Sequence, residues 1–281
     1  MTLRFQRTLA AGLLVLLMTL AAAANAMPAS TRVPGGVVVL RIASDAAPAP
    51  KARFQGRRVL VTWHDDAWHA VVGIPLATKP GRHRVRVEVG KRERDLAFDI
   101  APKHYPAQKL TIPDRRMVEP LDEDLERIRR EHEIMNRVRS HWREVDRVDL
   151  DLILPADGPL SSRFGLRRIL NDQPRSPHSG LDLAVPPGTP IHAAAAGMVV
   201  ATGDFFFAGK TVCVDHGQGL ITMYSHLDEI AVREGDRLAR GARLGRSGMS
   251  GRVTGPHLHW SVYLNGAVVD PEPFLKTFQS E

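Results

Sequence analysis

The sequence is poor in cysteine. Cys213 is the only cysteine among 281 residues, so a disulfide within the chain is excluded. It lies in the strand-like run 210–215, where we expect a buried structural thiol. A nucleophilic cysteine is the weaker alternative, because nothing near it in the run would activate the thiol.

Long hydrophobic runs are also scarce. The one example extends from Leu9 to Leu20, after Arg4 and Arg7 and before the small-x-small site that ends at Ala26. This three-part pattern predicts a secretory signal peptide over residues 1–26. An uncleaved anchor is the alternative, but the run is shorter than the roughly 20 residues of a spanning helix. We therefore expect cleavage after Ala26, no membrane association afterwards, and a periplasmic or secreted protein of the cell envelope.

Acidic residues are outnumbered by basic ones. The formal net charge is +7, the sequence pI is about 10.0, and 43% of the residues are hydrophobic. Such a chain is globular and long enough for two modest domains. Its charge indicates an anionic partner. Export argues against nucleic acid and favours a polymer or surface of the envelope.

Residues 27–101 have an all-β pattern. Apolar runs at 37–42, 58–63, 68–74, 84–89 and 96–100 are separated by turn residues, and residues 84–89 alternate strictly between polar and apolar. These features predict a small β-sandwich domain.

The composition changes in residues 102–149. Pro120 and the acidic residues 122–124 suit the start of a helix. One apolar stripe follows at three- and four-residue steps: Leu121, Leu125, Ile128, Met135, Val138, Trp142 and Val145. We expect a linker whose amphipathic helix packs as an arm against one domain; a partner-binding helix is the alternative.

Residues 150–281 are again rich in strand and turn signals, and two predicted strands carry polar side chains on one face. In 178–185, His178 and Asp182 share a face, and in 257–264, His257 and His259 do so. The opposite face of each strand is apolar. Each strand can therefore face a core on one side and present ligands on the other.

These residues suit a metal site. His178, Asp182 and one histidine of the 257/259 pair would supply a three-ligand set for zinc, with a fourth position left for water. The other histidine of the pair, and His226, would then be placed to move protons. Neither short motif is specific alone, but both together, beside a third histidine, favour a metal centre.

The same blocks resemble the lysostaphin-type (LytM-type) zinc metallopeptidases, which cut peptide bonds in bacterial cell-wall peptidoglycan. The resemblance covers about 155–273 and rests on the order and spacing of the blocks 161–168, 178–191, 215–227, 235–251 and 254–260. It implies one Zn²⁺ held by His178, Asp182 and His259, with His226 and His257 as catalytic residues. One departure is that the loop 169–177 lacks the tyrosine that several Gram-positive members carry.

The resemblance also implies an antiparallel-sheet peptidase domain at 150–281. Together with the strand and helix patterns before it, this predicts the fold class: mainly β, with the peptidase domain preceded by a small β-sandwich domain and a helical arm. The N-terminal strand pattern resembles, more loosely, the immunoglobulin-like β domain of some Gram-negative envelope proteins. The resemblance implies a narrow groove in the peptidase sheet.

We therefore expect a secreted zinc endopeptidase that hydrolyses peptide bonds in peptidoglycan stem peptides or cross-links. Arg163 and Arg167 are candidates to hold an acidic peptide, with a solvated surface role as the alternative for each. A non-catalytic regulator of other wall hydrolases, or a wall-binding protein led by the β domain, are alternative functions. The intact ligand set argues against the regulator, and a regulatory envelope partner stays open.

Overall fold

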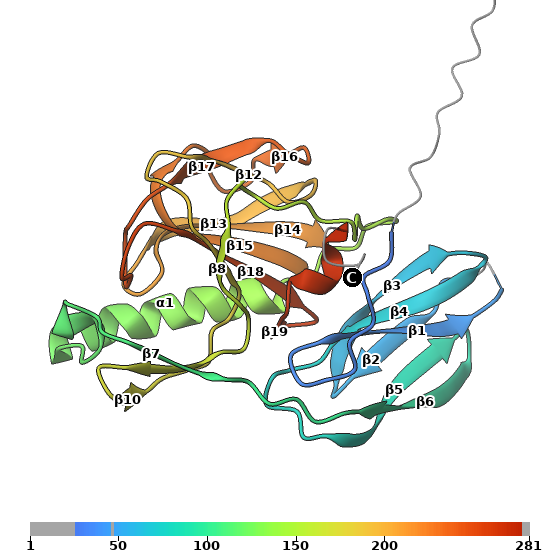
Figure 1. The fold of residues 1–281 in the computed structure, drawn as a ribbon. Coiled ribbons are helices and arrows are strands. Elements are labelled where there is room, and N and C mark those ends of the chain that lie inside the picture. Colours follow the sequence, from blue (N-terminus) through green and yellow to red (C-terminus); the bar gives the residue numbers. More distant parts are fainter. Residues whose placement is uncertain (1–25, 46–47, 277–281) are drawn as a thin grey trace, which may run out of the picture.

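The computed structural model describes residues 26–45 and 48–276 (Figure 1). The predicted signal peptide therefore lies outside the described residues, apart from Ala26. Within the described ranges, no helix combines the length and the apolar character needed to cross a membrane. The prediction of a mainly β chain with antiparallel sheets is confirmed, since one α-helix accompanies nineteen strands in these ranges.

The N-terminal region forms one six-stranded antiparallel sheet in the order β1-β4-β3-β2-β5-β6. Alternation along β5 follows the sequence pattern: Val85 and Val87 are buried, whereas Arg84 and Arg86 are exposed. The sheet folds over so that all six strands contribute to one apolar cluster. The strands are β1 (Val37–Ala43), β2 (Lys51–Phe54), β3 (Arg57–His64), β4 (Ala67–Gly73), β5 (Gly81–Val89) and β6 (Arg92–Ile100).

The linker contains β7 (Ala107–Leu110), the short 3-10 helix η1 (Arg115–Met117) and the helix α1 (Asp122–Ser140). Met135 and Val138 of α1 pack against the C-terminal sheet in a cluster that includes the buried Cys213. The predicted stripe is wrong at both ends. Leu121 and Leu125 are exposed, and Trp142 and Val145 lie beyond the last helical residue.

The C-terminal region is a ten-stranded antiparallel sheet whose main path runs β16-β13-β14-β15-β18-β11-β8. A small sheet, β10-β9-β7, lies beside it, and there β7 of the linker pairs in parallel with β9. The predicted boundaries at residues 101 and 149 stay predictions. The strands are β8 (Leu160–Ser162), β9 (Arg167–Leu170), β10 (Gln173–Pro174), β11 (Leu181–Leu183), β12 (Pro190–His192), β13 (Gly197–Phe205), β14 (Gly209–Gly217), β15 (Leu220–Ile230), β16 (Arg237–Leu238), β17 (Arg243–Ser247), β18 (Leu258–Leu264) and β19 (Ala267–Val269), followed by η2 (Glu272–Phe274).

The two sheets share a core. Val37, Leu60 and Val71, on the N-terminal sheet, belong to the same buried cluster as the apolar face of the C-terminal sheet. The Asn265 side chain bonds the backbone of Gly73 in both directions, accepting at 2.6 Å and donating at 3.0 Å. These contacts place the N-terminal sheet at the β18–β19 turn.

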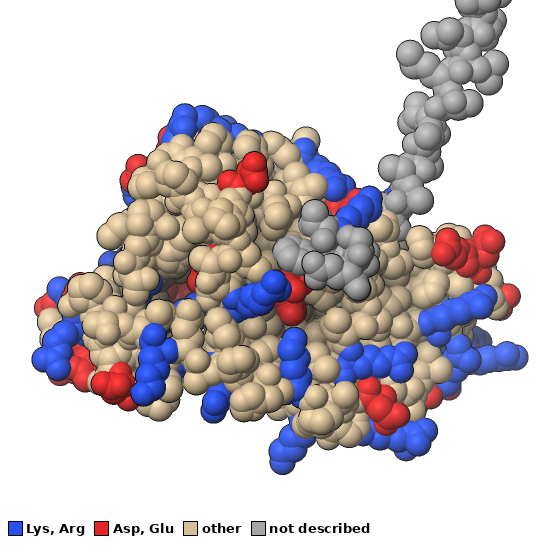
Figure 2. Space-filling view, in the orientation of Figure 1, with Lys and Arg blue, Asp and Glu red and all other residues tan. Residues whose placement is uncertain are grey.

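On the face drawn in Figure 2, the basic side chains are spread out rather than gathered in one patch. Figure 2 shows Lys and Arg side chains mixed with acidic ones, and many of the basic ones lie along the lower side of the view, where Figure 1 has the N-terminal sheet. This distribution suits weak attraction to an extended anionic polymer better than one tight charged interface.

Candidate metal centre

Two adjacent strands bring the predicted ligands together. β11 and β18 pair antiparallel with Asp182 directly opposite His259. The predicted strands were too long at their starts, because His178 and His257 precede β11 and β18. Both side chains still reach the site, where His257 is held by an isolated bridge to Gly248.

Gly180 permits the close approach of the segment that carries His178. A Cβ atom built at Gly180 would lie 2.2 Å from the carbonyl oxygen of Trp260. Such a contact is far inside van der Waals distance, so any side chain there would push His178 and Asp182 away from β18.

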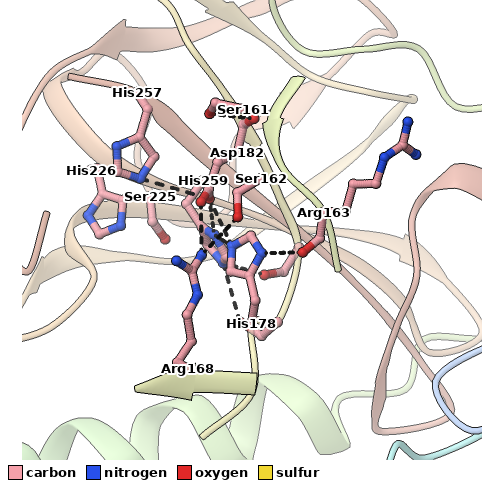
Figure 3. A network of polar contacts seen from close by, with 12 residues as sticks. Ser161, Ser162, Arg163, Arg168, His178, Asp182, Ser225, His226, His257 and His259 are labelled. Atoms are coloured by element: carbon pink, nitrogen blue, oxygen red, sulfur yellow. Dashed lines mark hydrogen bonds and ion pairs between the residues drawn. The ribbon is translucent and has the colours of Figure 1, made fainter. Parts of the chain in front are cut away.

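Three ligand atoms converge in a buried cluster (Figure 3). His178 Nε2 lies 2.9 Å from Asp182 Oδ1 and 3.0 Å from His259 Nδ1, and His259 Nδ1 lies 2.8 Å from Asp182 Oδ1. Ligand atoms around a tetrahedral zinc ion lie roughly 3.3 to 3.5 Å apart, so an adjustment of about half an ångström would admit the ion. Two imidazole nitrogens and one carboxylate oxygen form a donor set suited to zinc, and the residues fit it.

The remaining ring nitrogen of each candidate ligand has its own partner. His178 Nδ1 donates to the carbonyl oxygen of Arg163 at 2.7 Å. His259 Nε2 lies 2.9 Å from Ser261 Oγ and 3.3 Å from Ser179 Oγ. These contacts fix the ring orientations and leave His178 Nε2 and His259 Nδ1 for the metal, as in other histidine–metal sites.

Arg168 holds the second oxygen of the carboxylate. Its Nη2 donates to Asp182 Oδ2 at 3.1 Å and to Ser162 Oγ at 3.2 Å, and its Nη1 donates to Gln108 Oε1 at 2.6 Å. Oδ1 is thereby left to face the histidines. Burial raises the pKa of Asp182, but hydrogen bonds from His178 and His259 outweigh it and hold that pKa well below its usual value.

Sequence reasoning missed Arg168. Side chains alternate along β9, so Arg168 lies on the face opposite Arg167. This two-residue alternation is the sequence pattern that could have indicated that the two arginines have different surroundings. The side chains of the candidate substrate-binding residues Arg163 and Arg167 do not lie at the His178–Asp182–His259 ligand set. Arg163 pairs with Glu272 and points away from the histidines in Figure 3, and Arg167 Nε donates to the Tyr105 carbonyl at 3.1 Å.

His226 and His257 form a second pair beside the cluster. Their ring centroids lie 4.8 Å apart, and His257 Nε2 is 3.8 Å from Asp182 Oδ1. Each Nδ1 donates to a backbone carbonyl at 2.8 Å, that of Ser250 for His226 and that of Gly255 for His257. Both Nε2 atoms are therefore left as proton acceptors.

The backbone of His226 is strained. Its φ of 62° lies in the left-handed region, which β-strand residues other than glycine seldom occupy. Burial, reinforced by the charges of His257 and His259, lowers the pKa of His226 to about 3. The ring is therefore neutral near pH 7. Such strain at a buried polar side chain is typical of functional positions.

A cavity of about 340 Å³ opens over both groups of histidines. Its walls come from the C-terminal sheet and its loops, including those around Phe207 and Arg252, and from Leu110 and Ile112 of the linker. No residue of the N-terminal sheet is among the described lining residues, so that sheet does not close the cavity.

The comparisons agree with this geometry. The sequence model of Peptidase family M23 matches residues 176–271, and that of the Peptidase family M23 N-terminal domain matches residues 30–103. A solved structure from Pseudomonas aeruginosa, whose description names peptidase M23, is 43% identical with a TM-score of 0.74. The alignment covers 87% of this chain and 95% of that one. The chain belongs to peptidase family M23.

Two curated relatives are similar to part of this chain. Peptidoglycan DD-endopeptidase ShyA of Vibrio cholerae is 43% identical over 112 residues, and DD-carboxypeptidase/endopeptidase Mpg of Neisseria meningitidis is 38% identical over 112 residues. Each alignment covers 40% of this chain and 26% of the relative. The chain thus spans about a quarter of the length of these relatives.

Proposed function

We propose that this M23 chain is a zinc-dependent endopeptidase that hydrolyses peptide cross-links of peptidoglycan in the periplasm. The observation that carries the proposal is one cavity that holds a buried His-Asp-His ligand set and two further histidines whose Nε2 atoms have no hydrogen-bond partner among the described residues. The names of the Vibrio and Neisseria relatives support peptidoglycan as the substrate.

His178, Asp182 and His259 would hold the metal. When bound, zinc polarises a scissile carbonyl and lowers the pKa of a water molecule to about 7. The chain's own contribution is to fix the three ligand atoms. The backbone carbonyl of Arg163 orients His178, and the hydroxyl of Ser261 orients His259. The guanidinium of Arg168 donates to Oδ2 of Asp182, the carboxylate oxygen that does not face the histidines. With three protein ligands, the set keeps a position open, as catalytic zinc sites do.

His257 and His226 would handle protons. In each, the Nδ1–H is engaged by a backbone carbonyl, so Nε2 is the atom that accepts a proton from the attacking water or later returns it to the leaving amine. Because the pKa of His226 is lowered to about 3, that ring starts the cycle as a neutral base. We assign His257 to the same work, since its Nε2 is 3.8 Å from Asp182 Oδ1.

The bond we propose is the D-alanyl–diaminopimelate cross-link, in keeping with the DD-endopeptidase names of the relatives. A non-catalytic regulator is the weaker candidate, because such a role does not need the intact ligand cluster.

The direct test is digestion of purified peptidoglycan by the protein comprising residues 27–281, with muropeptides measured by mass spectrometry. We expect cross-linked dimers to be converted to monomers, with activity lost after chelation and restored by zinc. Intact dimers after incubation with the zinc-loaded protein would refute the proposal. Stem peptides shortened without loss of cross-links would shift it to a carboxypeptidase.

A further inference from the structure

Arg252 occupies a defined place on the cavity wall. It lies in the loop that connects β17 to β18, and both it and Phe207 line the cavity. Its guanidinium lies 4.4 Å from the centre of the Phe207 ring, and Nη1 donates to the carbonyl of Met117 at a long 3.4 Å. The side chain is only partly exposed. Arg252 is therefore a wall residue of the cavity and not a freely solvated cation.

The loop that carries Arg252 is tightly fixed. The backbone N–H of Arg252 donates to the Phe207 carbonyl at 2.9 Å, and Ser250 Oγ accepts from the N–H of Lys210 at 2.9 Å. A Cβ atom at Gly251 would lie 2.4 Å from Gly209 N, so the two loops touch backbone to backbone. A side chain on such a loop is held in place before any ligand arrives, and this reduces the entropic cost of binding.

The same loop supports both proton-handling histidines. The carbonyl of Ser250 accepts from His226, and that of Gly255 accepts from His257. The backbone N–H of Arg252 donates to the Phe207 carbonyl and that of His226 donates to the neighbouring Ala208 carbonyl, both at 2.9 Å, so Arg252 is anchored beside His226. A group bound by Arg252 would therefore lie on the side of the cavity where we place proton transfer.

The cavity wall has more positive charge than its own carboxylates can balance. Histidines aside, its charged residues are Arg139, Arg168, Arg252 and Asp182. Asp182 is already occupied by Arg168 and the ligand histidines. Among the described residues, no carboxylate lies within ion-pair distance of Arg252. Burial, with the charges of Arg175 and Arg168, lowers the pKa of Arg252 to about 10, so the guanidinium stays charged at neutral pH.

We propose that Arg252 binds a free carboxylate of the substrate peptide and so selects peptides that carry this carboxylate next to the bond to be cut. A half-buried guanidinium with one long hydrogen bond has several donors left, and its planar fork matches a carboxylate in a two-bond pairing. Phe207 covers one face of the guanidinium, which leaves its edge for the ligand. The inference rests on the proposed endopeptidase function and names its specificity-determining residue.

The test compares two synthetic cross-linked peptides that differ in one group: the free carboxylate beside the scissile bond, or its carboxamide. With the zinc-loaded enzyme we expect a lower KM for the acidic peptide. In Arg252→Ala, KM for the acidic peptide should rise roughly tenfold to a hundredfold, since the lost pairing is charge-assisted. KM for the amide and both kcat values should change little, because this binding is uniform between ground state and transition state.

Arg252→Lys and Arg233→Ala are the controls. Lysine keeps the positive charge but lacks the planar guanidinium that can donate two parallel hydrogen bonds. Arg252→Lys should therefore restore part of the preference for the acidic peptide over the amide. Arg233 is exposed and is not among the residues that line the cavity, so Arg233→Ala should behave as wild type. Equal KM values for the two peptides in the wild type would overturn the inference. So would an equal rise for both peptides in Arg252→Ala, since this would indicate a merely structural role.

The proposed endopeptidase function can fail separately. Calorimetry on the zinc-loaded His257→Ala protein would measure binding of both peptides without cleavage. If neither peptide is cut by the wild type, yet the acidic peptide binds more tightly and Arg252→Ala removes the difference, the carboxylate site stands and the hydrolytic function fails. Equal binding of both peptides would refute the carboxylate site by itself.

Discussion

The two large sheets of this chain differ in what they bury. The cluster inside the N-terminal sheet is apolar throughout, and among the described residues of this sheet and its loops the buried polar side chains are those of Thr62 and Thr78. The C-terminal sheet and its loops bury a polar set: Ser162, His178, Asp182, Thr211, Asp215, His216, Thr222, Ser225, His226, Ser247, His259, Ser261 and Asn265. Burying a polar group costs free energy unless the group is hydrogen-bonded. The difference between the two sheets therefore indicates that the functional residues belong to the C-terminal sheet.

The polar set is connected rather than scattered. His216 Nε2 lies 2.8 Å from Thr222 Oγ1, which donates to Tyr224 Oη at 2.9 Å, and this oxygen accepts from the N–H of Ala194 at 2.8 Å. Such networks make the surrounding geometry specific when every member has a partner. The interior of the N-terminal sheet is filled by apolar side chains, so substitutions in the two sheets should have different consequences.

The largest effects on activity are expected from substitutions at the metal ligands and the neighbouring catalytic histidines. His259→Ala should lose zinc and activity together, because it removes a ligand. His257→Ala should keep zinc and lose turnover by roughly 10²- to 10⁴-fold, the usual contribution of a general acid–base group. Metal content by atomic emission and kcat on muropeptide dimers measure the two properties separately. Loss of metal in both variants would undo the division of roles between the two histidines.

A change in the N-terminal core should be large for stability alone. Phe54 is 2% exposed and packs 5.6 Å from Phe98, centroid to centroid. Phe54→Ala should lower the free energy of unfolding by about 3 to 5 kcal/mol through lost burial and a new cavity. Urea unfolding measures the loss, while zinc content and kcat of the folded protein should stay at the wild-type values. A drop in zinc affinity would indicate that the two regions are coupled.

The ligand residues could be predicted because strand alternation is local. A period of two placed His257 with His259 and separated both from the apolar face, and the antiparallel pairing of β11 with β18 then brought Asp182 opposite His259. The family resemblance decided which histidine of the pair is the ligand. The strand starts were less predictable, since His178 and His257 lie in the preceding loops.

Other parts depend on contacts that the sequence does not display. The helical period continues through Trp142 and Val145, yet the helix ends at Ser140. Trp142 instead lies under the guanidinium of Arg58, 4.2 Å from its ring centre, and Val145 packs on the shared core of the two sheets. The role of Arg168 was hidden for the same reason, because its partner Gln108 comes from a strand about sixty residues earlier.

Arg168 should matter for metal affinity more than for folding. Removing the partner of a ligating carboxylate usually costs tenfold to a hundredfold in metal affinity. We expect Arg168→Ala to weaken zinc binding by roughly that factor, or about 1.4 to 2.7 kcal/mol, as measured by competition with a chelator. Gln108→Ala should have a smaller effect in the same direction, since it acts through Arg168.

The matched control for Arg168 is Arg86→Ala on the N-terminal sheet. Arg86 also pairs with an aspartate, Asp95, at 3.3 Å, but both side chains are exposed. Exposed pairs contribute little, and this one is remote from the cluster, so zinc affinity should not change. Equal zinc affinity in Arg168→Ala and wild type would show that the ligand histidines alone orient Asp182.

The smallest effect concerns pH. His216 is 4% exposed, and burial lowers its pKa from the ordinary 6.5. Below about pH 6.5, His216 binds a proton more readily in the unfolded chain than in the folded protein. The free energy of unfolding is therefore at its full value above about pH 6.5 and falls as the pH drops below it. One such group gives a slope of at most about 1.4 kcal/mol per pH unit. Urea unfolding of wild type and His216→Gln between pH 8 and pH 5 measures the slope.

The difference between the two proteins at each pH isolates His216, because other titrating groups contribute to both. Wild type should lose stability relative to His216→Gln as the pH falls. His69 of the N-terminal sheet is the comparison: burial lowers its pKa too, and in both histidines a bond to a backbone carbonyl opposes the shift, but the His69 ring is only half-buried. His69→Gln should therefore give the same sign and a smaller slope. A larger slope at His69 would mean that desolvation in the apolar sheet, rather than the buried polar network, sets the acid limit of the fold.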